Sequence, residues 1–424
     1  MTAAGHGPGP SSAQPALMGG LTRSTKPSSV EAALEQGQGI LRLAPTWVPR
    51  EFCVPGRRLK LHPDDYFALG GARGGIDERW LSSAIRADNG PLTGPDEGLS
   101  FVVGPNAEGL PFDEVVAHLG ADLIGERLWS EHGSWPMYSK FFDNEGPLPF
   151  HVHHTDEKAR LVGRKGKPEA YYFPPQMNNH LGTTPVSFFG LAPGTTKEQF
   201  KERLAGFGSQ GDNRVTELSQ AYRLRLGTGW DMPAGVLHAP ASVCTYEPQA
   251  ASDVFAMCES WTSCRSVSQD LLWKDVPPEH RGDLDFIVSL LDWDKNTDPD
   301  FFRSRFSPPV VVPSTPPGCQ ERWVVYRSPA FSAKELTVLP QQQVTVRDSA
   351  CYGCIVVQGR GWLGPWAVES PTLVRFGQLT SDEFFVSEPA ARAGVRVANT
   401  SATEPLVMLK HFGPGNPDNT LVAP

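Results

Sequence analysis

The pattern of apolar and polar positions divides the chain into four stretches. Residues 1–45 are rich in Gly, Pro, Ser and Ala, which predicts a disordered tail. Between residues 46 and 294, short apolar runs alternate with turn residues, and this predicts a strand-rich domain with helical insertions. Residues 295–320 contain the run PPVVVPSTPPG and predict a linker. From residue 321 to 424 strand-like runs follow one another, as is typical of a barrel or jelly roll.

Three helices are predicted inside the first domain. Apolar residues recur at helical spacing over residues 112–129, which predicts an amphipathic helix. A second helix is predicted to begin at a cap formed by Thr195 or Thr196 and to end near Gly206. Residues 283–293 are a third candidate. Because the chain also has 42 glycines and 40 prolines, many turns are expected, and the predicted fold class is mainly β with a few helices.

Composition and charge narrow the class of protein. The chain has 424 residues, 39% of them hydrophobic and 20% charged, which is typical of a soluble globular protein with more than one structural unit. The net charge is -9 and no long basic block occurs, so neither nucleic acid nor a membrane is an expected partner. There is no long apolar run and no signal-peptide pattern, and the seven cysteines are odd in number and scattered. We therefore expect a cytoplasmic protein.

Histidine and glutamate residues form a candidate metal site in the first domain. His151 and His153 are two positions apart in a strand-like run, so both imidazoles point to one face of the strand. Glu169 opens the next strand-like run, and His238 follows a Pro-Ala-Gly turn that presents it at the start of another strand. These four residues are the predicted ligands of one divalent metal ion.

The weight of this prediction comes from the four residues together. An isolated pair of histidines at this spacing is explained equally well by surface or core histidines, whereas Glu169 and His238 in the same order favour a metal. Three imidazoles and one carboxylate suit zinc, iron, nickel, manganese or cobalt without ranking them, and zinc is the metal we expect. The second domain has a single histidine, His411, and is predicted to be a degenerate copy without a metal.

The order of these motifs resembles the class I mannose-6-phosphate isomerases, a family of the cupin superfamily. That family has a core with the elements K-x-L-D, Q-V-H-P-D, K-P-E or K-T-E, P-A-G-T-x-H-A, a following glutamate and S-D. The segments of this chain that resemble these elements are Lys140–Asp143, His151–His153 with Asp156–Ala159, Lys167–Glu169, Pro233–Ala239, Glu247 and Ser252–Asp253. The resemblance covers roughly residues 65–260.

The resemblance implies a double cupin, that is, two jelly-roll β-barrels with a few helices. It also implies that Lys167 and Glu247 are the catalytic polar groups beside the metal. The basic residues Arg164, Lys165 and Lys167 could receive a phosphate, although a solvated turn is the favoured interpretation of Arg164 and Lys165. The implied partner is a small-molecule sugar or sugar phosphate, and a homodimer stays open because edge strands of cupin barrels often pair.

Two positions depart from the family pattern. His151 stands where the family usually has a glutamine ligand, and Met257 stands where it has an arginine. That arginine contacts substrate in the family, and Arg265 is the nearest arginine of this chain, displaced by several residues. The second exchange therefore bears on activity and leaves the predicted metal ligands unchanged.

Three functions follow as hypotheses. The first is a metal-dependent aldose–ketose isomerase acting on a sugar phosphate in carbohydrate metabolism. The second is another metal enzyme on the same scaffold, such as a dioxygenase or a lyase, since two histidines and a carboxylate also suit iron and oxygen. The third is a sugar-binding cupin without catalytic activity. The Lys-Pro-Glu and Pro-Ala-Gly-x-x-His elements favour the first.

Overall fold

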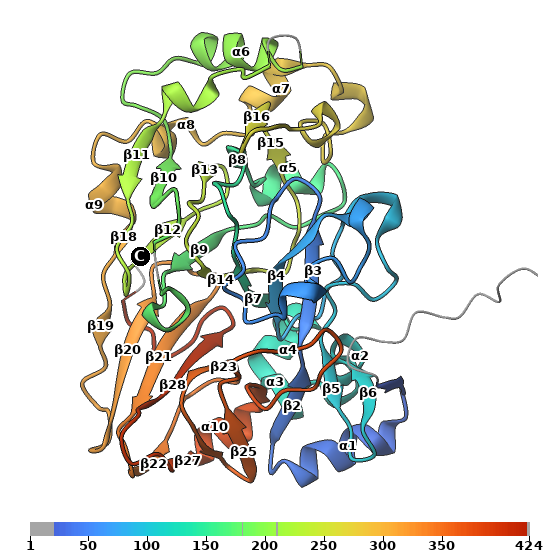
Figure 1. The fold of residues 1–424 in the computed structure, drawn as a ribbon, viewed down its shortest axis with the longest axis vertical. Coiled ribbons are helices and arrows are strands. Elements are labelled where there is room, and N and C mark those ends of the chain that lie inside the picture. Colours follow the sequence, from blue (N-terminus) through green and yellow to red (C-terminus); the bar gives the residue numbers. More distant parts are fainter. Residues whose placement is uncertain (1–20, 180, 209–210, 422–424) are drawn as a thin grey trace, which may run out of the picture.

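The computed structural model describes residues 21–179, 181–208 and 211–421 (Figure 1). The chain is mainly β, with short helices between the strands, as the sequence predicts. Most strands lie in four sheets of ten, seven, five and four strands. Within the described residues, each helix is too short or too polar to cross a membrane. All seven cysteines lie in the described part, and each is a free thiol.

Two sheets carry the candidate site. The larger has seven strands: β3 (Thr46–Arg50), β4 (Gly75–Leu81), β7 (Met137–Phe142), β9 (Glu169–Tyr172), β12 (Gly229–Met232), β14 (Thr245–Ala250) and β18 (Phe306–Ser307). Its strand order is β18-β12-β9-β14-β7-β4-β3. The five-stranded sheet consists of β8 (His151–Val152), β10 (Val186–Phe189), β11 (Gln220–Arg223), β13 (Leu237–Ala239) and β15 (Ala256–Met257), in the order β11-β10-β13-β8-β15.

The other two large sheets are built mainly from the C-terminal part of the chain. The ten-stranded sheet contains β1 (Thr22–Arg23), β2 (Ile40–Ala44), β5 (Phe101–Val103), β6 (Glu108–Pro111), β19 (Val310–Val311), β20 (Cys319–Val325), β21 (Ser332–Val338), β23 (Tyr352–Gln358), β26 (Glu383–Val386) and β28 (Leu406–Phe412). Its order is β1-β6-β5-β2-β26-β23-β28-β21-β20-β19. The four-stranded sheet consists of β22 (Gln343–Val346), β27 (Val395–Asn399), β24 (Arg360–Leu363) and β25 (Trp366–Glu369).

The N-terminal stretch is ordered from residue 21 onward, contrary to the predicted tail. It forms β1, the helix α1 (Pro27–Gln36) and β2, which pairs with β26 more than 300 residues away (Figure 1). Leu41 and Leu43 are 1% and 0% exposed, so β2 is a core strand. The prediction of a disordered tail is wrong for residues 22–44, because these apolar side chains find partners far along the chain. Residues 1–20 lie outside the described residues.

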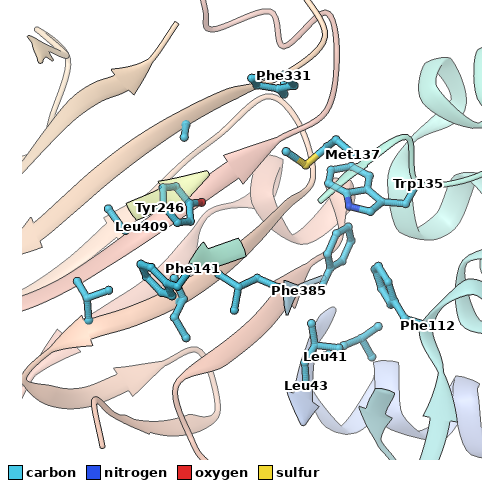
Figure 2. Close-up of a cluster of buried hydrophobic side chains, with 14 of the residues drawn as sticks. Leu41, Leu43, Phe112, Trp135, Met137, Phe141, Tyr246, Phe331, Phe385 and Leu409 are labelled. Atoms are coloured by element: carbon cyan, nitrogen blue, oxygen red, sulfur yellow. The ribbon is translucent and has the colours of Figure 1, made fainter. Parts of the chain in front are cut away.

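The largest apolar cluster joins the seven-stranded and ten-stranded sheets. Phe141 and Tyr246 come from β7 and β14, whereas Phe385 and Leu409 come from β26 and β28 (Figure 2). Trp135 stands edge-on to Phe385, with ring centroids 5.1 Å apart. Aromatic side chains bury the largest apolar areas, so this cluster is a main source of the stability of the fold.

Short helices lie around the sheets, and glycines decide where some of them end. The predicted helix over residues 112–129 is instead three pieces, α2 (Phe112–Leu119), α3 (Ala121–Ile124) and α4 (Glu126–His132). Gly120 and Gly125, with φ of 51° and 85°, separate them, because this conformation interrupts a right-handed helix. Of the two predicted caps, Thr195 and Thr196, the structure has Thr196, which begins α6 (Lys197–Ala205) with a capping box to Gln199.

The remaining helices are one to two turns long. They are α5 (Asp156–Arg160), α7 (Leu284–Val288), α8 (Trp293–Asn296), α9 (Phe301–Arg305) and α10 (Glu388–Ala393). Part of the predicted linker at 295–320 is therefore structured, since α9 is followed by β18, which pairs with β12, and by β19, which pairs with β20. The third predicted helix, over 283–293, is limited to α7 and the start of α8.

Glu383 is expected to make folding stability depend on pH. Burial raises the pKa of Glu383 to about 7, although Arg79 acts against this shift. The unfolded chain ionises this carboxyl near pH 4.3, so its stabilising contribution is complete below that pH and is lost as the pH rises through about 7. Urea unfolding at pH 4.5 and at pH 8 gives the free energy of unfolding at each pH. Its fall between the two should be smaller by about 3 kcal/mol in Glu383→Gln than in the unchanged chain. Equal falls in the two proteins would contradict the prediction.

Candidate metal centre

Three buried histidines meet between the two sheets of the N-terminal part. His151 lies on β8, His153 follows that strand, and His238 lies on β13, directly opposite His151. One ring nitrogen of each lies within 4.8 Å of those of the other two. Gly235, at φ +83°, forms the turn before His238, and its N–H donates to the carbonyl of His153 at 2.8 Å. The structure therefore brings together the three predicted histidines.

The backbone orients all three imidazole rings. The Nδ1 atoms of His151, His153 and His238 lie 2.6, 2.7 and 2.8 Å from the backbone oxygens of Pro149, Val254 and Val236. A carbonyl oxygen can only accept a hydrogen bond, so each Nδ1 donates, and in the neutral ring each Nε2 carries a lone pair. This is the arrangement in which metal-binding histidines are held by a hydrogen bond from the other ring nitrogen.

Glu169 faces two of these histidines. Its Oε2 atom lies 2.9 Å from Nε2 of His153, and its Oε1 atom lies 3.1 Å from Nε2 of His238. The hydroxyl of Tyr171, two residues along β9 and on the same face, donates to Glu169. Tyr171 was not predicted from sequence, although its spacing of two residues from Glu169 is a signal that could have identified it.

The charge states of the histidines and Glu169 favour a bound cation. Burial, together with the charge of Lys167, lowers the pKa of His153 to about 3. Burial alone would raise the pKa of Glu169, but His153, His238 and Lys167 together hold it well below its usual range. The Nε2 atom of the neutral His153 ring therefore faces an ionised carboxylate oxygen at 2.9 Å with no proton between them. Such opposed lone pairs are stabilised when they share a metal ion, so these residues fit a metal.

The two predicted catalytic residues lie beside Glu169. The ammonium group of Lys167 is 3.6 Å from Oε2 of Glu169, and Lys167 is buried. Glu247 lies on β14, which pairs with β9, and it is 2% exposed. Burial raises the pKa of Glu247 well above its usual range, and the neighbouring charge of Glu169 raises it further. Lys140 Nζ, 3.4 Å from Oε1 of Glu247, counteracts part of that shift.

A chain of buried charges continues from Glu247 across the seven-stranded sheet. Lys140 Nζ lies 2.9 Å from Glu78 Oε1, and Glu78 Oε2 accepts from Nε of Arg50 at 3.0 Å. Both terminal nitrogens of Arg50 donate to the carboxylate of Asp253, each at 3.2 Å. The next residue along the chain is Val254, whose carbonyl holds His153. Arg50 and Glu78 therefore fix the segment that orients a histidine of the site.

The structure also shows where the residues that depart from the family pattern lie. Met257 pairs directly with His151 across β15 and β8, so its apolar side chain shares the face that carries the histidine. Arg265 is exposed and lies 3.5 Å from the backbone oxygens of Glu51 and Cys53. The exposed Arg164, proposed for phosphate, is paired with Asp88 at 2.5 Å.

The fold is shared with the mannose-6-phosphate isomerases. No protein-family model matches the chain, and no curated protein matches it by sequence. Solved structures do match: phosphomannose isomerase from Salmonella typhimurium, as a point mutant, has a TM-score of 0.61 at 12% identity, covering 89% of this chain and 100% of that one. Mannose 6-phosphate isomerase from Bacillus subtilis has a TM-score of 0.56 at 17% identity, covering 88% and 100%. A zinc-bound mannose 6-phosphate isomerase has a TM-score of 0.59 at 11% identity, covering 89% and 100%.

Proposed function

We propose that this chain is a metal-dependent aldose–ketose isomerase acting on a sugar phosphate. The observation that carries the proposal is a buried site in which one ring nitrogen of each of three histidines lies within 4.8 Å of the others, with the Glu169 carboxylate facing His153 and His238. The fold shared with mannose-6-phosphate isomerases supports the same activity, one of those structures being zinc-bound.

In this proposal His151, His153, Glu169 and His238 bind one divalent metal, zinc in the first place. A bound divalent ion would act as a Lewis acid toward the sugar oxygens and stabilise negative charge on them. The donor set of imidazoles and one carboxylate suits zinc, and a higher coordination number leaves positions for substrate.

Isomerisation moves a proton between two adjacent carbons, so a base must exchange it. Glu247 is the residue proposed for this exchange, because burial and the charge of Glu169 raise its pKa and so make its carboxylate a stronger base. The ammonium of Lys167, beside Glu169, would donate to a sugar oxygen. Both side chains are buried and held by neighbouring charges, which places them for a defined role.

The scaffold proposed for this site is a double cupin. The strand order β12-β9-β14-β7-β4-β3 in one sheet has a counterpart in the order β20-β21-β28-β23-β26-β2 of another. The five-stranded and four-stranded sheets would complete the two barrels. In this division residues 46–294 form the metal-binding unit and residues 321–424 the degenerate unit, to which β2 contributes a strand.

The test is a turnover assay on the purified chain after chelation and reloading with zinc. Mannose 6-phosphate is supplied, and the formation of fructose 6-phosphate is followed with a coupled enzyme. Turnover that disappears in His153→Ala would support the proposal. Absence of turnover in a zinc-loaded protein would contradict the mannose 6-phosphate activity.

Removing one histidine is expected to abolish metal binding. Losing a group that only hydrogen-bonds to a metal ligand weakens metal binding by up to about 100-fold. Because His153 is itself a proposed ligand, His153→Ala should weaken zinc binding by more than about 100-fold. Metal content by elemental analysis and competition with a chelator would measure it. The control is His154→Gln, because the His154 imidazole instead lies 3.0 Å from the backbone oxygen of Asp275. Equal zinc affinity in the two variants would argue against the site.

A second candidate function is a metal-binding cupin that binds sugars without isomerising them. Met257 favours it, since a thioether stands on the face of His151 where the related isomerases have an arginine. Calorimetric binding of mannose 6-phosphate without turnover would separate this candidate from the isomerase.

A further inference from the structure

The C-terminal part of the chain contains a cavity far along the sequence from the metal centre. Its volume is about 550 Å³, in the range of small-molecule sites. It is lined by β19 and β20 on one side and by residues of β22 on the other. These strands belong to two different sheets, with β19 and β22 each at the end of its sheet. The cavity therefore lies at a seam where two sheet edges face each other without pairing.

Buried charges form the floor of this cavity. Lys334 Nζ lies 2.7 Å from Asp348 Oδ1, and Lys410 Nζ lies 2.7 Å from Asp348 Oδ2 and 2.5 Å from Glu321 Oε1. All four residues are at most 4% exposed. The ammonium of Lys334 also stands 4.8 Å above the ring centroid of Trp323. Of these, Glu321, Lys334 and Trp323 line the cavity.

Buried ion clusters are costly in a hydrophobic core, because desolvation of each charge offsets much of the attraction between them. The surrounding cluster of this unit is otherwise apolar, with Leu336, Val346 and Met408 among its members. A charged floor that opens into a cavity is more simply explained by recognition of a ligand than by stability. Similarly placed strands in the N-terminal unit carry the candidate metal centre on their inner face.

The lining defines the chemistry of the ligand. Glu321 and Asp418 offer carboxylate acceptors, and Lys334 offers a donor, so hydroxyl groups can bind to both. At the rim, Arg347 is exposed and forms no ion pair with any other residue that the structure describes. A free guanidinium at the mouth of such a cavity suits a compact anion.

We propose that this cavity binds a hydroxylated anion of monosaccharide size, a sugar phosphate or a sugar acid. The floor residues Glu321 and Lys334 bind its hydroxyl groups, and Arg347 binds the anionic group. The site is separate from the metal centre and does not require the isomerase activity. If the chain is an isomerase, this second site is a place where a metabolite other than the substrate can bind.

Isothermal titration of the full-length chain tests the proposal. The protein carries His153→Ala and is treated with chelator, so that the candidate metal centre cannot hold a metal-dependent ligand. Glucose 6-phosphate and gluconate are the two probes, and they distinguish a phosphate from a carboxylate as the anionic group. Glucose and inorganic phosphate are the partial probes. We expect one of the two full probes to bind at least about tenfold more tightly than either partial probe.

Two variants locate the binding. Arg347→Ala should weaken it at least about tenfold, and Ser314→Trp should abolish it by filling the mouth of the cavity. The matched control is Arg396→Ala, an exposed arginine on the neighbouring strand β27 that does not line the cavity. Unchanged binding in Arg347→Ala, no binding of either full probe at millimolar concentration, or equal affinity for inorganic phosphate would overturn the proposal.

Discussion

Replacing Glu247 with glutamine is expected to lower kcat of the proposed isomerase by about 10² to 10⁴-fold, the usual contribution of a general acid–base group. Glutamine is nearly isosteric and can still accept a hydrogen bond from Lys140, which lies 3.4 Å from Oε1 of Glu247. It cannot take up or release a proton. A loss confined to kcat, with KM nearly unchanged, is the result that identifies proton transfer.

The physical basis is the position of Glu247 on the inner face of the seven-stranded sheet. It lies between Lys140, directly opposite on β7, and the strand β9 that carries Glu169. Burial and the charge of Glu169 raise the pKa of Glu247 well above its usual range. A raised pKa makes the Glu247 carboxylate a stronger base than an ordinary glutamate, which favours its taking a proton from a sugar carbon.

The control is Glu383→Gln, which removes another buried glutamate of raised pKa. Glu383 lies on β26, in the ten-stranded sheet, and bonds to Arg79 and to the backbone N–H of Ser82. Its kcat should equal that of the unchanged chain, and both variants should retain zinc. If Glu247→Gln keeps kcat within about threefold, below the range for a general acid–base group, Glu247 has only a structural role within β14 and the sugar-binding alternative gains support.

Local spacing was enough to predict the three histidines that the structure brings together. His151 and His153 share a strand face because side chains alternate, and the Pro-Ala-Gly turn before His238 has the positive φ that glycine provides. The helix cap was narrowed to Thr195 or Thr196 for the same reason, since the capping box at Thr196 involves only residues three apart. Each of these features is decided within a few residues.

Features that depend on strand register could not be predicted in this way. The contact of Lys140 with Glu78 joins residues 62 positions apart, and that of Arg50 with Asp253 joins residues 203 positions apart. The first contact follows from the pairing of β4 with β7, whereas the second depends on where the segment between β14 and β15 passes β3. No local pattern in the sequence contains that information, because any strand with alternating polarity could occupy the same place.

The N-terminal strand β2 shows a related limit. Its sequence, ILRLA, is strand-like, but it is preceded by a long stretch rich in Gly, Pro and Ser. Composition averaged over 45 residues concealed a short apolar segment whose partner is β26. The prediction of one continuous helix over 112–129 was wrong for the opposite reason. Its apolar period is regular, but Gly120 and Gly125 interrupt the helix. Glycine conformation is determined by the packing of its neighbours, not by the period of the side chains.

Replacing Arg79 with methionine is expected to destabilise the fold by about 3 to 5 kcal/mol, the usual loss when one partner of a buried ion pair is removed. Arg79 lies on β4 and binds both oxygens of Asp382 at 2.8 Å and Glu383 at 3.2 Å. It is 5% exposed. Methionine fills most of the volume but leaves both carboxylates buried without their counter-ion. Urea unfolding at pH 8 measures the change.

The matched control is Arg86→Met, because Arg86 also pairs with two carboxylates but its side chain is 43% exposed. Solvent screens such pairs, so the expected loss is within about 1 kcal/mol. Adding Asp382→Asn and Glu383→Gln to Arg79→Met should recover much of the stability, since no unpaired charge then remains. Equal losses from Arg79→Met and Arg86→Met would mean that apolar contacts such as those of Phe385 hold the two sheets together (Figure 2). The buried ion cluster would then contribute no net stability to that interface.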